Sequence, residues 1–261
     1  MAMNNITLTS GMRSNLFSLQ QTQTLMESTQ TRLSTGKKVN SALDDPINFF
    51  AAQGHTQRAS DLAMRKDEMS EAIQTIKAAN NGIEAVTDMI ASAKSLAQSA
   101  LATADTAERN DLSVQYGDLI DQIETTVVDS GYKGVNLLND ADELTVTFDP
   151  SGDSIITVSA VDGTGGLLDT QSTNDWDALA DVSTDIGLLD DARDALRVDA
   201  KGLSNNLSTI TIRQEFTSKM INTLEDGAAN LVNADLNEEG ANMLMLQTRQ
   251  SLGTTSLSLA S

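Results

Sequence analysis

The chain has 261 residues and a formal net charge of −20, with 17 basic and 37 acidic residues, one histidine and no cysteine. These counts exclude a disulfide framework, a cysteine nucleophile and a multi-histidine metal site within one chain, and the acidity argues against binding to duplex DNA. No long apolar run is present, and the N-terminal residues lack an apolar segment. We therefore expect neither membrane insertion nor a cleavable secretory signal.

The low content of aromatic residues and proline favours long helices. Aromatic residues make up 3% of the chain, and the two prolines are Pro46 and Pro150. Aromatic side chains supply much of the burial in compact cores, and proline is the strongest helix breaker. The composition therefore predicts helices that pack side by side.

Residues 1–43 carry a local charge of +3. Apolar residues and glutamines recur there at alternating intervals of four and three residues, which predicts a helix in heptad register. Glutamine occupies two positions of this seam, so the helix would be marginal without partner helices. Gly36 is expected to end it, and the residues before Pro46 form a break. The seam residues that we expect to be buried are Met12, Leu16, Leu19, Met26 and Leu33.

A second helical region follows from about 47 to 104. The same spacing continues from Met69 to Ile90, which predicts one long helix. A polar break is expected at 105–110. A further helix then spans Leu112 to Val127 and stops near Gly131 in turn-forming sequence.

The composition changes at about residue 140. Between residues 136 and 200 there are fifteen acidic and two basic residues. Residues 144–148 and 156–161 alternate with period two around a turn at Pro150, which predicts a β-hairpin, and 172–174 are expected to be a loop. The many carboxylates of this region have few apolar residues around them. Such surroundings do not give two carboxyl groups the different pKa values that acid–base catalysis requires. We therefore expect no catalytic residue, no cofactor and no metal.

Helical periodicity returns from about 183 and is strongest there, with a break near 235–240 before a terminal helix. Because the seam-bearing segments lie at opposite ends of the sequence, an antiparallel arrangement would bring the two chain ends together. The predicted fold is mainly α, with long antiparallel helices forming a coiled coil from the chain ends and a small β-hairpin insert in the middle. The expected seam residues here are Leu203, Leu207, Ile210, Ile221, Leu224, Leu231, Met245 and Leu252.

The run TRLSTGKKVNSALDDP at 31–46 resembles a segment of bacterial flagellin, the filament subunit. GYKGVNLL at 131–138 is similar to the turn that follows the second core helix of that family, and 247–258 resembles its C-terminal helix. The chain departs from the family pattern at 46–48, where Pro-Ile-Asn replaces the usual small residues. The motif residues in the first run are Arg32, Leu33, Gly36, Asn40, Ser41, Asp44 and Asp45.

The resemblance implies a structural subunit, not an enzyme, that is secreted and self-assembles into the extracellular flagellar filament for motility. Residues 1–43 with 232–261 would form an inner coiled-coil domain. Residues 44–140 with 180–231 would form an outer helical tube domain, and 141–179 an acidic hairpin insert. The implied partners are further copies of the chain, the flagellar export apparatus, a chaperone, and the cap and hook-associated proteins. No nucleic acid is expected.

Three alternatives remain open at this point. A hook–filament junction protein has similar terminal helices, although the run from Arg32 to Asp45 favours flagellin. A secreted zinc protease on the same scaffold would need the two histidines of HExxH, and the chain has one. A soluble coiled-coil adaptor would be discrete in solution and would not polymerise.

The resemblance also bears on host recognition. The segment similar to the epitope for Toll-like receptor five has Ser92 and Ser95 where an arginine and a glutamate are expected, and only Lys94 keeps a positive charge. Serine cannot replace the planar fork of arginine. We expect weak activation of that receptor.

Overall fold

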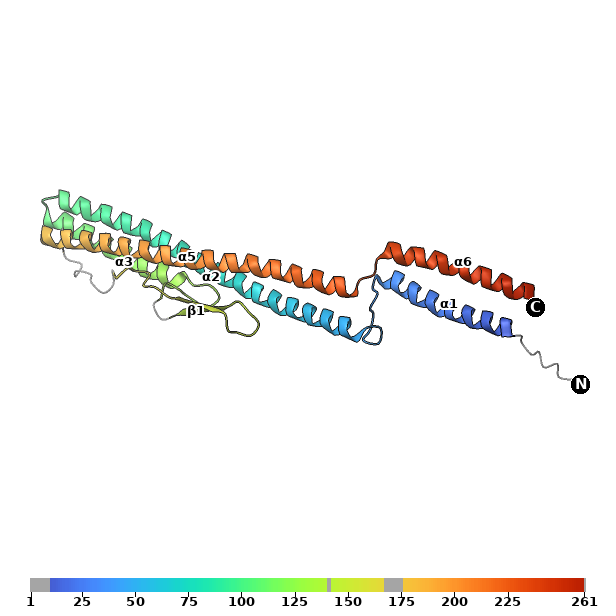
Figure 1. Cartoon of the computed structure of the whole chain (residues 1–261). Coiled ribbons are helices and arrows are strands. Elements are labelled where there is room, and N and C mark those ends of the chain that lie inside the picture. Colours follow the sequence, from blue (N-terminus) through green and yellow to red (C-terminus); the bar gives the residue numbers. More distant parts are fainter. Residues whose placement is uncertain (1–9, 140–141, 167–175, 261) are drawn as a thin grey trace, which may run out of the picture. The chain divides into compact units, whose positions relative to one another are not determined.

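A computed structural model of the chain describes residues 10–139, 142–166 and 176–260. Within these ranges it contains five α-helices and one two-stranded sheet (Figure 1). The predicted loop at 172–174 lies outside the described residues. The elements in chain order are α1 (Ser10–Thr35), α2 (Pro46–Ala102), α3 (Thr106–Asp129), β1 (Glu143–Thr147), β2 (Ile155–Ser159), α5 (Leu179–Val232) and α6 (Leu236–Ala260).

Aspartate side chains begin three of the helices. The carboxylate of Asp45 accepts a hydrogen bond of 3.0 Å from the backbone N–H of Asn48, at the start of α2. Asp105 and Asp235 accept equivalent bonds at the starts of α3 and α6. Each carboxylate satisfies a backbone donor that has no partner within its helix. Pro46 takes the first position of α2, where its missing N–H costs nothing.

The chain divides into two compact units, residues 1–59 with 222–261 and residues 60–221. α2 and α5 each contribute to both units. We describe the units separately and call them the terminal unit and the central unit.

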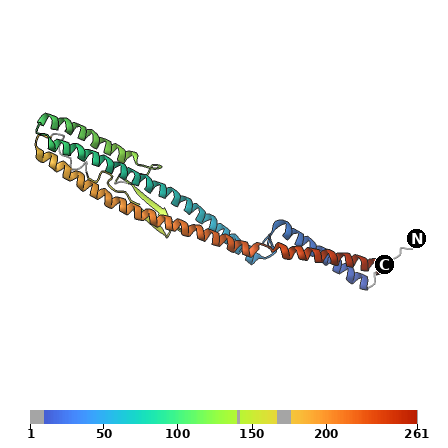
Figure 2. The ribbon, with the colours of Figure 1, turned by 90° about the horizontal axis from the view of Figure 1, so that it is seen from above.

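The central unit has an apolar core built by α2, α3 and α5, which run side by side (Figures 1 and 2). The hairpin adds Val146 and Val158 to this core, with β1 antiparallel to β2 and Val146 opposite Ile156. The fold prediction is thereby confirmed for the hairpin and for the long helices. Fully buried core side chains include Met69, Ile76, Ile90, Ile120, Ile123, Leu189, Leu196, Leu203 and Ile210.

The only tryptophan of the sequence is also buried in this unit. Trp176 Nε1 donates a 2.7 Å hydrogen bond to Asp185 on α5, and its ring centroid lies 5.0 Å from that of Tyr116 on α3. Arg109 Nε donates to the Trp176 carbonyl at 3.0 Å. Burial, together with the charge of Asp185, raises the pKa of the Tyr116 hydroxyl. These contacts hold Trp176, which lies just before α5, against α3.

Three predicted boundaries were wrong. The break expected at 105–110 lies at 103–105, because the carboxylate of Asp105 starts α3 at residue 106. α5 begins at Leu179 instead of near residue 183. The break expected at 235–240 lies at 233–235, since the Asp235 carboxylate starts α6 earlier than the glycine at 240 suggested.

Gly82 allows α2 to pack closely against the segment after α3. A Cβ at position 82 would lie 2.6 Å from Leu138 Cδ1, and the Ser130 side chain would obstruct it as well.

We predict that Gly82→Ala lowers the unfolding free energy of the central unit, because overpacking costs about 1–3 kcal/mol and exceeds the helix-propensity gain of about 1 kcal/mol. Urea unfolding followed by Trp176 fluorescence measures the change. Gly187→Ala on α5, where a Cβ would meet nothing within 4 Å, is the control and should be neutral or stabilising.

Candidate assembly site

In the terminal unit, α1 and α6 pack against each other (Figure 1). Asn15 bonds to Ser256 at 3.5 Å, Gln250 to Gln23 at 3.1 Å, and Arg32 to Glu239 at 3.0 Å. The residue number rises on α1 as it falls on α6, so the two helices are antiparallel. The pairing of the chain ends that the sequence predicts is therefore present within one chain.

The contact between α1 and α6 is only partly apolar. Leu246 on α6 is buried, as are Thr22 and Thr29 on α1. The helices approach closely at Gly253, where an added Cβ would lie 2.6 Å from Leu19 Cδ2. Of the predicted seam residues on α1, Leu16 is exposed, whereas Met12, Leu19, Met26 and Leu33 are half-buried.

Arg32 forms the charged contact of this pair. Its Nη1 donates a 3.0 Å hydrogen bond to Glu239 Oε1, and the exposed fractions of the two side chains are 42% and 10%. Arg32 thus reaches from the surface to a carboxylate that water hardly contacts. A carboxylate in that position is costly unless a cation pairs with it.

A short backbone ladder joins the segments that follow α1 and α5. Lys38 N–H donates to the Val232 carbonyl at 2.8 Å, and Ala234 N–H donates to the Gly36 carbonyl at 2.9 Å. Gly36 has a φ of 70°, a left-handed conformation that glycine adopts without strain and that ends α1 as predicted. The ladder sets the positions at which α1 and α6 begin to run together.

The rest of the motif run forms a turn around one carboxylate. Asp44 Oδ2 accepts bonds of 2.9 Å from the backbone N–H groups of Asn40 and Ser41. These two bonds hold the pKa of Asp44 below its usual value, and the bond from Asn40 has the larger effect. The bond from the Asn48 N–H does the same for Asp45. The motif residues therefore have local structural roles, which bend the chain from α1 into α2.

The predicted seam on α5 is buried to different degrees. Leu203 and Ile210 are fully buried, and Leu207, Ile221, Leu224 and Leu231 are half-buried.

Met245 and Leu252 on α6 lie outside the α1–α6 contact, with exposed fractions of 61% and 67%. Within the chain, the face that meets α1 carries Leu246 and Gly253 instead, which is one residue away from the predicted register. A role for Met245 and Leu252 in contacts between subunits stays a prediction.

Sequence reasoning missed three residues of this site, namely Glu239, Leu246 and Gly253. A spacing of four and three also runs through Leu246, Gln250, Gly253 and Leu257, and this spacing is the signal in the sequence that could have indicated the row. The long-range partner of Arg32 had no signal in the sequence.

The receptor-epitope equivalent lies on α2 in the central unit. Ser92 and Ser95 are exposed. Lys94 Nζ lies 2.6 and 2.7 Å from the two carboxylate oxygens of Asp190, and this contact lowers the pKa of Asp190. The one cation of the segment is thus paired within the chain.

Within the described ranges, no group of three or more histidine, cysteine or acidic residues could hold a metal ion. In the same ranges, no helix is long and apolar enough to cross a membrane.

Comparison with known proteins finds similarity to bacterial flagellins. A family model described as the bacterial flagellin N-terminal helical region matches residues 4–143. Flagellin FljO of Caulobacter vibrioides is 30% identical over 261 residues, which cover 100% of this chain and 96% of that protein. A flagellin of Brucella melitensis is 25% identical and covers 94% of this chain, and 91% of its own length is matched. The crystal structure of Bacillus cereus flagellin shares 18% identity, with a TM-score of 0.43, and covers 68% of this chain and 94% of that one.

The paired terminal helices and the helical central unit, together with these relatives, define a structural protein. The chain belongs to the bacterial flagellin family. It is a structural subunit of the flagellar filament, and these comparisons give no support to the hook–filament junction alternative.

The Arg32–Glu239 pair gives a direct test of the α1–α6 contact. We predict that Arg32→Met lowers the thermal stability of the polymerised protein, because a poorly hydrated carboxylate left without its partner costs about 1–3 kcal/mol. Adding Glu239→Gln to Arg32→Met should recover most of the loss, since the uncompensated charge is gone. Thermal denaturation followed by far-UV circular dichroism measures both. Lys201→Met, at an exposed lysine on α5, is the control, and an equal loss in that variant would contradict the role of the pair.

Weak recognition by Toll-like receptor five stays a prediction. We expect the monomer to activate a receptor-reporter cell line poorly, and the Ser92→Arg and Ser95→Glu double variant to activate it more strongly, because interface arginines are frequent hot spots. Wild-type activation at the concentration at which an enteric flagellin works would contradict this expectation.

Proposed function

We propose that this flagellin polymerises by burying the exposed apolar faces of α1 and α6 between subunits. The observation that carries the proposal is that α6 is apolar on two sides. Leu246 covers α1, whereas Leu244, Met245, Leu252 and Leu259 are exposed in the single chain. Large apolar side chains that gather on the exposed side of a helix are candidates for burial against another molecule. On α1, Phe17 and Leu25 are exposed in the same way.

Further copies of the chain are the partner that suits these faces. A contact between two different surfaces of identical subunits repeats without closing and so builds an open helical filament. The half-buried and polar contact between α1 and α6 supports coupled folding, in which the terminal helices become stable only when neighbouring subunits cover them.

The domain boundaries of the assembled subunit are part of this proposal. Residues 1–43 with 232–261 would form the inner coiled-coil domain, and 44–140 with 180–231 the outer helical domain. Residues 141–179 would form the acidic insert. Support for the inner domain comes from the antiparallel pairing of α1 with α6 and from the ladder that ends near residue 39 on one side and 232 on the other.

The route to the filament is also proposed. Export of the unfolded chain through the flagellar apparatus suits a sequence without cysteine, since no disulfide can obstruct passage. A chaperone, the cap and the hook-associated proteins would be its transient partners, and the protein would act outside the cell without enzymatic activity.

Two kinds of variant test the proposed assembly. Deletion of residues 236–261 removes α6 and should abolish polymerisation of the purified protein while the Trp176 fluorescence of the central unit stays unchanged. The Met245→Ser and Leu252→Ser double variant is sharper, because it leaves the α1-facing side of α6 intact. Burial of each such side chain contributes about 1.5–3 kcal/mol, so we expect the critical concentration for polymerisation to rise at least about tenfold.

Electron microscopy and sedimentation of seeded samples measure both effects. Ile155→Ser, at an exposed apolar residue of β2, is the matched control and should polymerise normally. Normal filaments from the α6 deletion or from the double variant would show that this face is not used.

A further inference from the structure

A second apolar surface lies in the turn before α2 and in its first two turns. The exposed fractions of Leu43, Ile47 and Phe50 are 96%, 81% and 60%. Ile47 and Phe50 are three residues apart and therefore share a face of α2. We call Leu43, Ile47 and Phe50 the apolar ridge. The chain has only five phenylalanines, and one of them, Phe50, is more than half exposed here.

The ridge is held rigidly. Leu43 is one of the residues of the turn 40–44. The Asp44 carboxylate closes this turn by accepting hydrogen bonds from the backbone N–H groups of Asn40 and Ser41. Asp45 starts the helix that carries Ile47 and Phe50, and Pro46 fixes its own φ at the first position. A rigid surface loses little conformational entropy on binding, so the ridge is preorganised for a contact.

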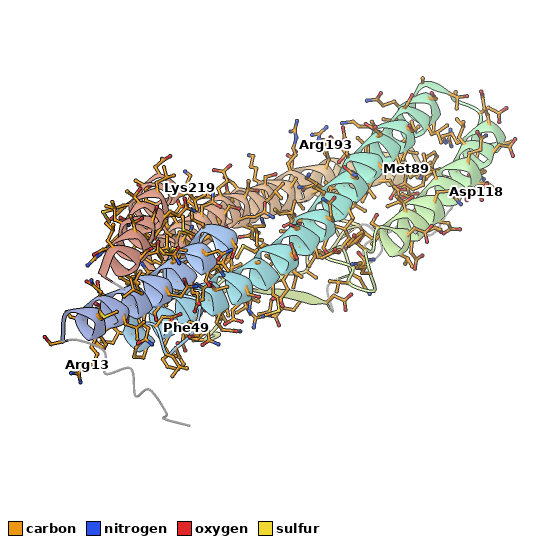
Figure 3. The ribbon with its side chains drawn as sticks, turned by 90° about the vertical axis from the view of Figure 1, so that its right-hand side faces the viewer. Arg13, Phe49, Met89, Asp118, Arg193 and Lys219 are labelled. Atoms are coloured by element: carbon orange, nitrogen blue, oxygen red, sulfur yellow. The ribbon has the colours of Figure 1, made fainter. Side chains whose placement is uncertain are left out.

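The same unit contains a groove that fits such a ridge. Its volume is about 430 Å³, and its apolar lining consists of Val39, Phe49, Ala52, Ala228, Ala229 and Val232. Three of these six residues are alanines, so the groove has room for larger side chains. Phe49 lines the groove, whereas its neighbour Phe50 belongs to the ridge. Figure 3 labels Phe49. The two rings touch edge to face, with centroids 5.5 Å apart.

The charges around the two surfaces are complementary on one side. Asp44 lies within the ridge segment, next to Leu43, and its carboxylate is negatively charged at neutral pH. Lys37 lies on the rim of the groove. Glu225 lies on the rim as well and would repel Asp44. A ridge entering the groove would therefore be oriented with Asp44 toward Lys37 and away from Glu225.

We infer that the apolar ridge of one subunit inserts into this groove of a second copy of the chain. The inference rests on the proposed function, since it adds a second subunit contact to the one made by α1 and α6. A second copy is the occupant that the structure favours, because ridge and groove belong to the same chain, both are apolar, and Lys37 on the groove rim suits Asp44 of the ridge segment. The ridge and the groove are different surfaces, so the contact repeats from subunit to subunit.

The first test removes the ridge without touching the groove. The Leu43→Ser and Ile47→Ser double variant should keep the far-UV circular dichroism spectrum and Trp176 fluorescence of the wild type, because both side chains are exposed. Its critical concentration for polymerisation should rise about tenfold or more. Ile155→Ser is again the matched control. Polymerisation of the double variant at the wild-type critical concentration would overturn the inference.

The second test identifies what the ridge touches. Because the chain has no cysteine, single Ile47→Cys and Ala229→Cys variants of different mass can be co-polymerised and oxidised with a mild disulfide-forming reagent. We expect a covalent dimer that joins position 47 of one chain to position 229 of the other, since a disulfide needs Cα atoms within about 7 Å. An Ile155→Cys variant in place of Ile47→Cys should give no such dimer. Filaments that form only 47–47 dimers, or no dimer, would overturn the inference.

The outcomes separate this inference from the proposed function. Failure of the wild-type chain to form filaments would refute the proposed function itself. Normal polymerisation of the ridge variant, together with loss of assembly in the Met245→Ser and Leu252→Ser variant, would refute only the ridge contact. Loss of secretion by the ridge variant, with normal polymerisation of the purified protein, would assign the ridge to another partner and would also refute the inference.

Discussion

Backbone hydrogen bonds between residues 36–39 and 232–234 hold together two segments that lie about two hundred residues apart in sequence. They depend on Gly36, whose φ of 70° turns its carbonyl toward Ala234 at the end of α1. Because this ladder lies directly after α1 and directly before α6, it also sets which residues of α1 meet which residues of α6. The Arg32–Glu239 pair and the Gly253–Leu19 approach both follow from that register.

Much of this site could be predicted from local chemistry. Gly36 at the end of one helix, and the antiparallel pairing of the chain ends, followed from periodicity and turn-forming residues. The register of α6 could not be predicted in the same way. A helix with leucine or methionine on two sides offers two rows of apolar residues, and periodicity alone does not choose between the row through Met245 and the row through Leu246. Tertiary contacts choose, namely the backbone ladder before α6 and the approach of Leu19 to Gly253.

The two units differ in how they obtain stability. The central unit buries Ile90, Ile120, Leu189 and Trp176 completely, so its helices have partners within one chain. The terminal unit holds α1 and α6 together with threonines, glutamines and one ion pair, and leaves large apolar side chains in contact with water. Such an arrangement suits a subunit whose ends gain stability only in an assembly.

The three polar bridges between α1 and α6 have a mechanical consequence. They occur at Asn15, Gln23 and Arg32, eight and nine residues apart, which corresponds to roughly 12 Å along a helix at 1.5 Å per residue. If one helix slid along the other, all three bridges would have to break at once, and Leu19 would be pushed away from Gly253, where α6 has no side chain to obstruct it. The pair is therefore built to resist shear along its axis.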